Sequence, residues 1–159
     1  MKKICFLISV IVLVLTVNVP FAADSKAIKV IADGQEIKFT DAAPTIDENN
    51  RILVPARAML NCEMYRFYKI NWNQAKKQVT INDNALMTIT FEIGKKTAYV
   101  EYSTLPEYNK SKTIDMDTSA KIINNRIYIP LRSFVELLYG EVKWDSKNKV
   151  VTIINNAEG

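Results

Sequence analysis

Hydrophobic and polar residues alternate along several short segments of this chain, and this pattern predicts a protein built mostly of β-strands. The clearest alternation runs from Met87 to Ile93, where apolar residues are separated by threonine and glutamate. A period of two is that of a strand with one buried face. Two shorter runs, residues 27–30 and 36–39, flank an Asp33-Gly34 pair, which is typical of a β-hairpin turn. A turn at residues 94–96 then leads into a further strand at 97–102.

One phrase occurs twice in the chain. Residues 51–58 read RILVPARA, and residues 126–133 read RIYIPLRS. Each copy is followed by a helix-like stretch, a tryptophan (Trp72, Trp144) and a Val-Thr-Ile strand. We therefore expect a duplicated unit, with half-repeats at about residues 28–83 and 84–155.

The proline of each copy predicts a change from strand to helix. We expect Pro55 and Pro130 at the first helical position, where a missing N–H leaves no helical hydrogen bond unmade. After Pro130, apolar residues recur at helical spacing up to Leu138, and Gly140 is expected to end that helix as its C′ residue. The first copy has no such glycine and a longer path to its tryptophan, so we expect an extra turn or a distorted exit at about residues 65–68.

Each helix is expected to lead into a hairpin. The first has Trp72 on one strand and a turn at residues 73–77, and the second has Trp144 and a turn at 145–149. The predicted fold class is therefore α+β, a mostly antiparallel sheet with two short helices. The polar segment 103–112 is expected to be a mobile loop.

The first 23 residues are expected to be a secretory signal peptide. Two lysines precede an apolar run, residues 4–19, and small residues follow for cleavage after Ala22 or Ala23. The apolar run is short for a membrane span, which needs about twenty residues, although an uncleaved anchor helix is the alternative. We expect residues 24–159 to form a single soluble domain that is secreted, either free outside the cell or associated with the cell wall.

Charge and cysteine content limit the partners and the covalent cross-links that this chain can have. The formal net charge of +4 includes two lysines of the signal peptide, so the exported chain is only weakly basic and nothing suggests nucleic acid. Cys62 would be the single remaining thiol, which excludes an intrachain disulfide. We interpret Cys62 as a small buried hydrophobe, with an intermolecular bridge or a reactive thiol as the alternative.

The chain contains few of the residue combinations that catalytic sites use. The chain contains no histidine, which excludes Ser-His-Asp and Cys-His arrangements and histidine-ligated zinc or copper. Calcium at Asp115 and Asp117, or at the oxygen-rich turn 47–50, is the alternative to a solvated loop. Ser146 and Lys149 have a Ser-x-x-Lys spacing that we interpret as chance. Lysines at the hairpin tips favour solubility, with weak attraction to anionic wall polymers as the alternative.

Arg57 and Arg132 lie in the first turn of the two predicted helices, where the helix dipole disfavours positive charge. We therefore expect a carboxylate or backbone carbonyls to hold each one, and Arg132 could pair with Glu136. Structural bracing is the favoured role, and ligand binding is the alternative. Trp72 and Trp144 are expected in or near the core, with sugar stacking as the alternative.

The stretch from Ile127 to Asp145, with its Pro-Leu-Arg, its Trp144-Asp145 pair and the later Val-Thr-Ile, resembles the copper amine oxidase N-terminal, or stalk, domain. The first copy departs from that pattern, with Ala56 in place of leucine and Asn73 in place of aspartate. The resemblance implies an antiparallel sheet wrapped on a helix, in exported bacterial proteins. It also implies a non-catalytic module, because the oxidase would need three histidine ligands and an Asn-Tyr-Asp/Glu cofactor motif, which this chain lacks.

The sequence thus predicts a secreted, non-catalytic binding or structural module of the bacterial cell envelope, with no cofactor and no copper. Its expected partner is a cell-wall polymer or an envelope protein, and the sequence predicts no oligomeric state. The alternatives are a carboxylate-based hydrolase of wall polymers and a secreted inhibitor or partner-binding protein that uses the 103–112 loop.

Overall fold

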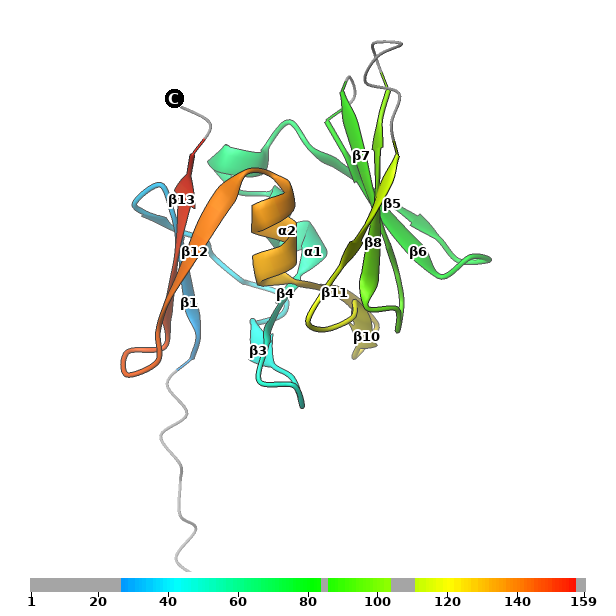
Figure 1. Cartoon of the computed structure of the whole chain (residues 1–159). Coiled ribbons are helices and arrows are strands. Elements are labelled where there is room, and N and C mark those ends of the chain that lie inside the picture. The colour runs from blue at the N-terminus through cyan, green and yellow to red at the C-terminus, as the bar shows by residue number, and fades with distance from the viewer. Residues whose placement is uncertain (1–26, 84–85, 104–110, 157–159) are drawn as a thin grey trace, which may run out of the picture.

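The computed structural model describes residues 27–83, 86–103 and 111–156, which form two short helices among three sheets (Figure 1). The predicted α+β class is confirmed. The predicted signal peptide and most of the predicted loop lie outside the described residues. The strands and helices are β1 (Lys29–Ala32), β2 (Gln35–Glu36), β3 (Thr45–Ile46), β4 (Ile52–Pro55), α1 (Ala56–Leu60), the 3₁₀ turn η1 (Glu63–Tyr65), β5 (Lys69–Asn73), β6 (Gln78–Asn82), β7 (Met87–Glu92), β8 (Thr97–Tyr102), β9 (Lys112–Asp115), β10 (Lys121–Ile123), β11 (Arg126–Pro130), α2 (Leu131–Leu137), β12 (Gly140–Asp145) and β13 (Val150–Asn155).

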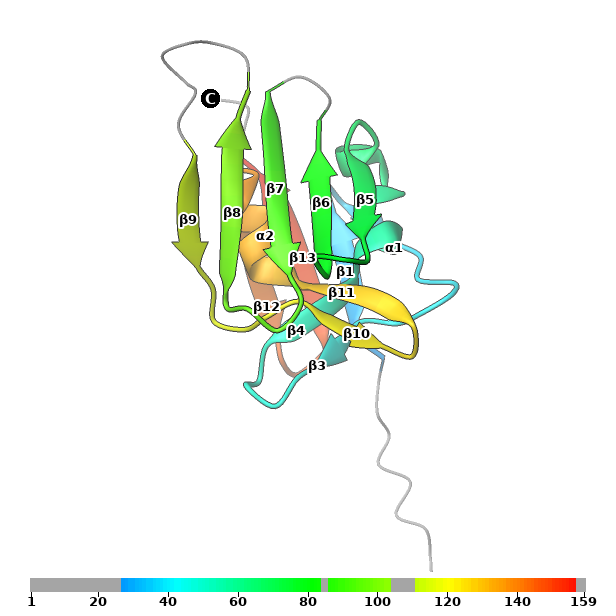
Figure 2. The same ribbon diagram turned by 90° about the vertical axis from the view of Figure 1, so that its right-hand side faces the viewer.

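Two of the three sheets are antiparallel throughout. One has the order β5-β6-β7-β8-β9 and the other has the order β10-β11-β4-β3. The third sheet, β12-β13-β1-β2, contains a parallel pair, because β1 runs beside β13 with Val30 opposite Val151. Figures 1 and 2 show the two helices between this sheet and the five-stranded one.

The order strand, strand, helix, strand, strand occurs twice along the chain, first from β3 to β6 and then from β10 to β13. The inner strands of the two series, β4 and β11, pair side by side and antiparallel. Val54 lies opposite Ile129 at the middle of this pair, and both are fully buried. Pro55 and Pro130 therefore lie at opposite ends of the pair. The duplication as such remains a prediction from the sequence.

The core forms where the alternating faces of the sheets meet the helices. Side chains of β7 alternate between buried and half-buried, as the sequence pattern predicts. Leu131, Phe134 and Val135 of α2 and Leu138 directly after it are buried, which confirms the helical spacing. The Phe134 ring meets the edge of the Tyr65 ring, with 5.1 Å between their centres. This contact ties α2 to the 3₁₀ turn that follows α1, and that turn confirms the expected distorted exit of the first copy.

The prediction that the prolines take the first helical position is wrong by one residue. Pro55 has φ −60° and ψ 117°, and Pro130 has φ −62° and ψ 114°. Both are extended and precede the first helical residue. The reason is that both are still part of the central β-pair, with Pro55 opposite Tyr128 and Pro130 opposite Leu53.

Gly140 does not end α2 as its C′ residue, and that prediction is also wrong. Tyr139 occupies this position with φ +62°, and Gly140 begins β12. A Cβ atom on Gly140 would lie 2.7 Å from Cγ1 of Val135 and 3.2 Å from the carbonyl oxygen of Ile154. The glycine is needed because β12 passes close to the end of α2, not because of its φ angle.

The Asp33-Gly34 turn is confirmed, since both residues have positive φ, 46° and 75°, and β1 pairs antiparallel with β2 across them. Among the residues that the structure describes, no helix has the length and apolarity to cross a membrane.

Candidate functional site

Two hollows open on the surface, and each is lined by the arginine that follows the proline of one repeated phrase and by the tryptophan that comes after that phrase. We call the hollow of Arg57 and Trp72 the first hollow; its volume is about 440 Å³. The hollow of Arg132 and Trp144 is the second hollow, with a volume of about 220 Å³. Both are open to solvent, so they are surface depressions and not internal cavities.

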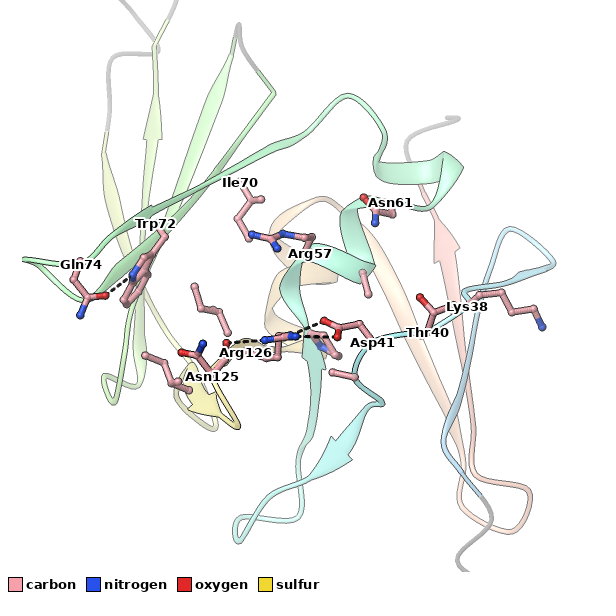
Figure 3. Close-up of a pocket in the computed structure, with 15 residues that line it drawn as sticks. Lys38, Thr40, Asp41, Arg57, Asn61, Ile70, Trp72, Gln74, Asn125 and Arg126 are labelled. Atoms are coloured by element: carbon pink, nitrogen blue, oxygen red, sulfur yellow. Dashed lines mark hydrogen bonds and ion pairs between the residues drawn. The ribbon is translucent and has the colours of Figure 1, made fainter.

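The first hollow lies where α1, β5 and the β10–β11 hairpin meet (Figure 3). The start of α1 contributes Arg57, and β5 contributes Ile70 and Trp72, which point the same way because strand side chains two residues apart share a face. The opposite wall comes from the hairpin and from the segment before β3. Its residues include Asp41, Ile122, Asn125, Arg126 and Ile127.

One ion pair holds that opposite wall together. The guanidinium of Arg126 donates to both oxygens of Asp41, from Nε at 2.5 Å and from Nη2 at 2.9 Å. The hydrogen bond from Arg126 lowers the pKa of Asp41, and the same contact raises the pKa of Arg126. Both groups therefore stay charged, and they neutralise each other.

The second hollow has the same construction. The start of α2 contributes Arg132 and Ser133, and β12 contributes Val142 and Trp144. The opposite wall comes from the β3–β4 hairpin and the segment before β10. Its residues are Ile46, Asn50, Arg51, Ile52, Asp117 and Thr118. Nε of Arg51 donates to Asp117 at 2.7 Å, in the place that the Arg126–Asp41 pair has in the first hollow.

The two hollows are built from corresponding residues of the two halves. Proline, arginine, the strand apolar residue and tryptophan are 55, 57, 70 and 72 in one and 130, 132, 142 and 144 in the other. The arginine on the opposite wall of each hollow comes from the other copy of the phrase, because β4 and β11 are antiparallel and the end of one lies beside the start of the other. The hollows therefore lie at opposite ends of the central pair.

Among the described residues no hydrogen bond or ion pair holds Arg57 or Arg132 in the expected way, although the charge of Arg57 helps, after Arg126, to lower the pKa of Asp41. Both side chains are exposed, and neither makes a hydrogen bond or an ion pair with any of the described residues. The proposed partner Glu136 does not pair with Arg132 within that part of the chain. The physical reason is exposure: helices of five and seven residues have a weak dipole effect, and water solvates a charge at their first turn without a partner. Figure 3 shows Arg57 extending from α1 toward Ile70 of β5.

The tryptophans pack at the margin of the core, as expected. Both are half-buried and contact the buried cluster. Nε1 of Trp72 donates to Oε1 of Gln74 at 2.8 Å (Figure 3). The remaining indole surface of each lines its hollow, so packing and ligand contact are compatible roles for these rings.

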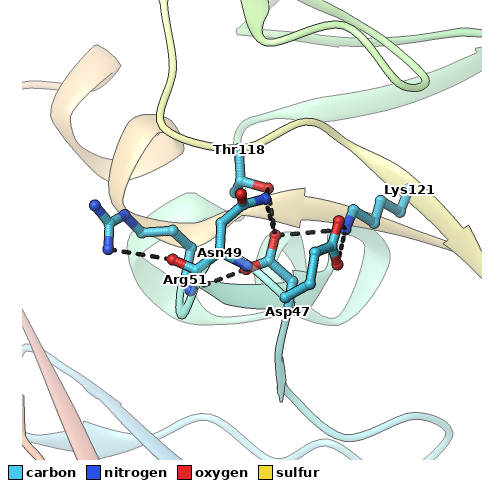
Figure 4. Close-up of polar contacts among 6 residues, drawn as sticks. Asp47, Asn49, Arg51, Thr118 and Lys121 are labelled. Carbon is cyan, nitrogen blue, oxygen red and sulfur yellow. Dashed lines mark hydrogen bonds and ion pairs between the residues drawn. The ribbon is translucent and has the colours of Figure 1, made fainter.

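Asp47 is the centre of a polar network beside the second hollow (Figure 4). Its side chain is 2% exposed and accepts backbone N–H groups of Asn49 and Arg51, both at 2.9 Å, and the hydroxyl of Thr118. Lys121 lies 3.4 Å away and also binds Glu48 at 2.5 Å. Burial by itself would raise the pKa of Asp47, but these hydrogen bonds outweigh it and hold the pKa well below its usual range. The oxygens of this turn therefore bind donors of the protein itself.

Asp145 lies outside both hollows, at the tip of the β12–β13 hairpin. Its Oδ1 accepts the backbone N–H of Asn148 at 3.0 Å. Asn73 does the same at the β5–β6 tip, where its Oδ1 accepts the N–H of Lys76 at 3.0 Å. Asn73, which stands in place of the aspartate of the family pattern, therefore makes the same hydrogen bond in its hairpin turn.

Other chemistry-bearing groups stay apart. Asp115 is exposed at the end of β9, while Asp117 pairs with Arg51. No cluster of three or more acidic or thiol side chains suited to a metal ion occurs in the described ranges. Cys62 is half-buried against the core, and burial raises the pKa of its thiol. This environment supports the hydrophobic role of Cys62.

Sequence reasoning missed the two ion pairs. The arginines were visible as the first residue of each repeated phrase, but their carboxylate partners lie 66 and 85 residues away in sequence. No local pattern identifies Asp41 or Asp117 as those partners.

Comparison with known families gives one match. The model of the copper amine oxidase N-terminal domain matches residues 31–154. This range includes both hollows. Searches of curated proteins and of solved structures found no match.

Proposed function

The chain belongs to the copper amine oxidase N-terminal domain family, and from this premise we propose that it is a non-catalytic binding module of the bacterial cell envelope. In this family the domain is a non-catalytic, stalk-like module. The envelope location rests on the predicted signal peptide, residues 1–23.

One observation carries the binding role: each hollow presents an arginine that makes no hydrogen bond or ion pair with the described residues, beside a half-buried tryptophan. An exposed charge is stable in water without a partner, so exposure alone indicates no function. The placement of the guanidinium next to an aromatic surface in a concave place is what favours a binding surface.

The electrostatics favour binding over hydrolysis. A general acid for glycoside hydrolysis needs a carboxyl group whose pKa is raised. Asp41 and Asp47 both have a lowered pKa, because hydrogen bonds from Arg126 and from Thr118, Arg51 and Asn49 stabilise their charged forms. The hydrolase alternative therefore gains no support from Asp41 or Asp47.

The inhibitor alternative depends on the 103–112 loop. Residues 104–110 lie outside the described part of the chain; β8 ends at Tyr102 before them, and β9 begins at Lys112 after them. The residues that line the two hollows are all described, so we base the proposal on the hollows.

The proposal is tested by locating the protein and then measuring its retention. Fractionation of the producing cells should place the chain, shortened at its N-terminus, in the wall or medium fraction. The purified protein should then be retained on isolated wall material and should release no reducing sugar from it. A chain that stays cytoplasmic, or one that binds neither wall material nor any protein of the secreted fraction, would contradict the proposal.

A further inference from the structure

We propose that the two hollows are a matched pair of sites for an acidic sugar unit, that is, a sugar ring carrying a carboxylate or a phosphate group. This inference rests on the proposed binding function and specifies its ligand. Three properties that the hollows share lead to it: a free positive charge, an aromatic surface and an amide on the opposite wall.

The charge comes from Arg57 in the first hollow and Arg132 in the second. In each hollow the other arginine, Arg126 or Arg51, already binds an aspartate, so the unpaired guanidinium leaves the hollow positive. A guanidinium binds a carboxylate or a phosphate with two parallel hydrogen bonds, which a lysine cannot do. The hollows therefore favour a ligand with one such anionic group.

The aromatic surface favours a sugar ring as the carrier of that group. One face of a pyranose is made largely of C–H bonds and is apolar, whereas its rim carries hydroxyl groups. The half-buried indoles of Trp72 and Trp144 offer a fixed apolar surface whose orientation is set by core packing. The adjacent Ile70 and Val142 widen that surface.

Each hollow also has an asparagine on its opposite wall, and its amide can bond to the hydroxyl groups of a sugar ring. Asn125 and Asn50 each precede the ion-paired arginine of their hollow, and both have positive φ, 61° and 57°. Asparagine adopts this conformation more readily than other residues with a Cβ. The shared backbone geometry brings an amide donor and acceptor to the same place in both hollows. An acidic peptide could also bind the arginine. It would not, however, offer both an apolar ring face to the indole and a rim of hydroxyl groups to the amide.

The placement at opposite ends of the β4–β11 pair makes the chain bivalent. A wall polymer repeats its acidic unit many times, so one polymer strand, or two neighbouring strands, can occupy both hollows of one molecule. Linked sites raise the overall affinity through effective concentration, without any new contact. We therefore expect weak binding of a single acidic unit and much tighter binding of the polymer.

The test is a calorimetric titration of the full secreted chain with four probes, followed in parallel by tryptophan fluorescence. The probes are a short oligomer of galacturonic acid, the matching neutral galactose oligomer, an oligomer of N-acetylglucosamine 1-phosphate, and polyglutamate. We expect an acidic oligosaccharide to bind at two sites and to change the indole emission, while the neutral oligomer does not bind. Binding of the uronic oligomer alone identifies a carboxylate ligand, and binding of the phosphate oligomer alone identifies a phosphate ligand. Binding of neither, or equal binding of polyglutamate, overturns the inference.

Variants separate two specific sites from general charge attraction. Arg57→Gln and Arg132→Gln should each remove one of the two sites, and the double variant should lower the affinity for the acidic oligomer roughly tenfold to a hundredfold, as expected for lost hydrogen bonds to a charged group. The matched control is Lys95→Gln with Lys147→Gln, which removes two exposed charges at hairpin tips outside both hollows. An equal loss in this control overturns the inference.

Failure of this inference is distinguishable from failure of the proposed function. If the chain is retained on wall material and the double arginine variant is retained equally well, the binding function stands and the acidic-sugar sites do not. If the wild-type chain is retained neither by wall material nor by any protein of the secreted fraction, the function itself is contradicted.

Discussion

The guanidinium of Arg126 binds the carboxylate of Asp41 with two hydrogen bonds, across 85 residues of sequence. Arg51 and Asp117 form the corresponding pair across 66 residues. Each pair ties the start of one central strand to the segment that precedes the hairpin of the other. All four side chains are largely exposed, so the pairs contribute little to stability. Their main effect is to fix the outer wall of each hollow and to neutralise one of its two arginines.

Replacing Asp41 separates these two effects. In Asp41→Asn, Arg126 loses its anionic partner, so the first hollow gains a free positive charge while the midpoint of urea unfolding stays almost unchanged. We expect tighter binding of the acidic oligomer at the first hollow, measured by calorimetry. Glu63→Gln is the control, since it releases Arg66 from an exposed pair outside both hollows. A large drop in the unfolding midpoint for Asp41→Asn would show that the pair is structural.

Gly140→Ala should destabilise the fold by about 1–3 kcal/mol, as expected for overpacking. The new Cβ would lie 2.7 Å from Cγ1 of Val135 and 3.2 Å from the carbonyl oxygen of Ile154. Urea unfolding measures the loss. Adding Val135→Ala removes the shorter clash, so the double variant should lose less than the sum of the two single variants. Strict additivity would mean that the clash is not the cause.

Lys77→Gly and Lys149→Gly should each stabilise the fold by about 0.5–1 kcal/mol. Both lysines end a hairpin turn with positive φ, 49° and 53°, a conformation that costs a residue with a Cβ atom about 1 kcal/mol or more. Part of that gain is lost to the greater chain entropy of glycine in the unfolded state. Thermal and urea unfolding test the prediction. Lys76→Gly, at the neighbouring position without positive φ, should give no gain.

Phe134→Ala should cost about 3–5 kcal/mol, because the ring is fully buried and its removal leaves a cavity beside Tyr65. This loss is a large part of the total stability of an ordinary domain. The measurement is the free energy of unfolding from urea titration. Phe67→Ala is the size-matched control, since that ring is 66% exposed and its loss should change stability by less than about 0.5 kcal/mol.

Asp47 should make the fold sensitive to acid. Its folded pKa is lowered, because hydrogen bonds from Thr118, Arg51 and Asn49 outweigh the effect of burial. A lowered folded pKa stabilises the native state above the unfolded pKa, about 3.9, and this stabilisation is lost as pH falls further. The free energy of unfolding should therefore decrease below about pH 4.

Asp47→Ala should remove this part of the pH dependence. At neutral pH it should also cost about 1–3 kcal/mol, because the donors of Asn49, Arg51 and Thr118 lose their acceptor. Urea titrations at pH 7 and pH 3 compare the two proteins. Parallel curves for Asp47→Ala and wild type would contradict the assignment.

Local patterns predicted most of the elements but not their ends. The alternation of Met87 to Ile93 and the positive-φ turn at Asp33-Gly34 are confirmed, because both depend on neighbouring residues only. Pro55 and Gly140 were assigned wrongly at the helix ends. Pro55 stays extended because it is paired to Tyr128, and Gly140 is required by contact with Val135 and Ile154. Both causes are tertiary.

The repeated phrase by itself determined which residues come together within each half: a proline that ends a strand, an arginine on the next helical turn and a tryptophan on the following hairpin. These residues are near one another in sequence, so local strand and helix geometry is enough to group them. The antiparallel pairing of β4 with β11 decided the rest. It placed the start of each strand beside the end of the other, brought Asp41 to Arg126 and Asp117 to Arg51, and left Arg57 and Arg132 to solvent. Contacts between residues so far apart in sequence depend on the packing of the whole chain, and no local pattern of residues encodes them.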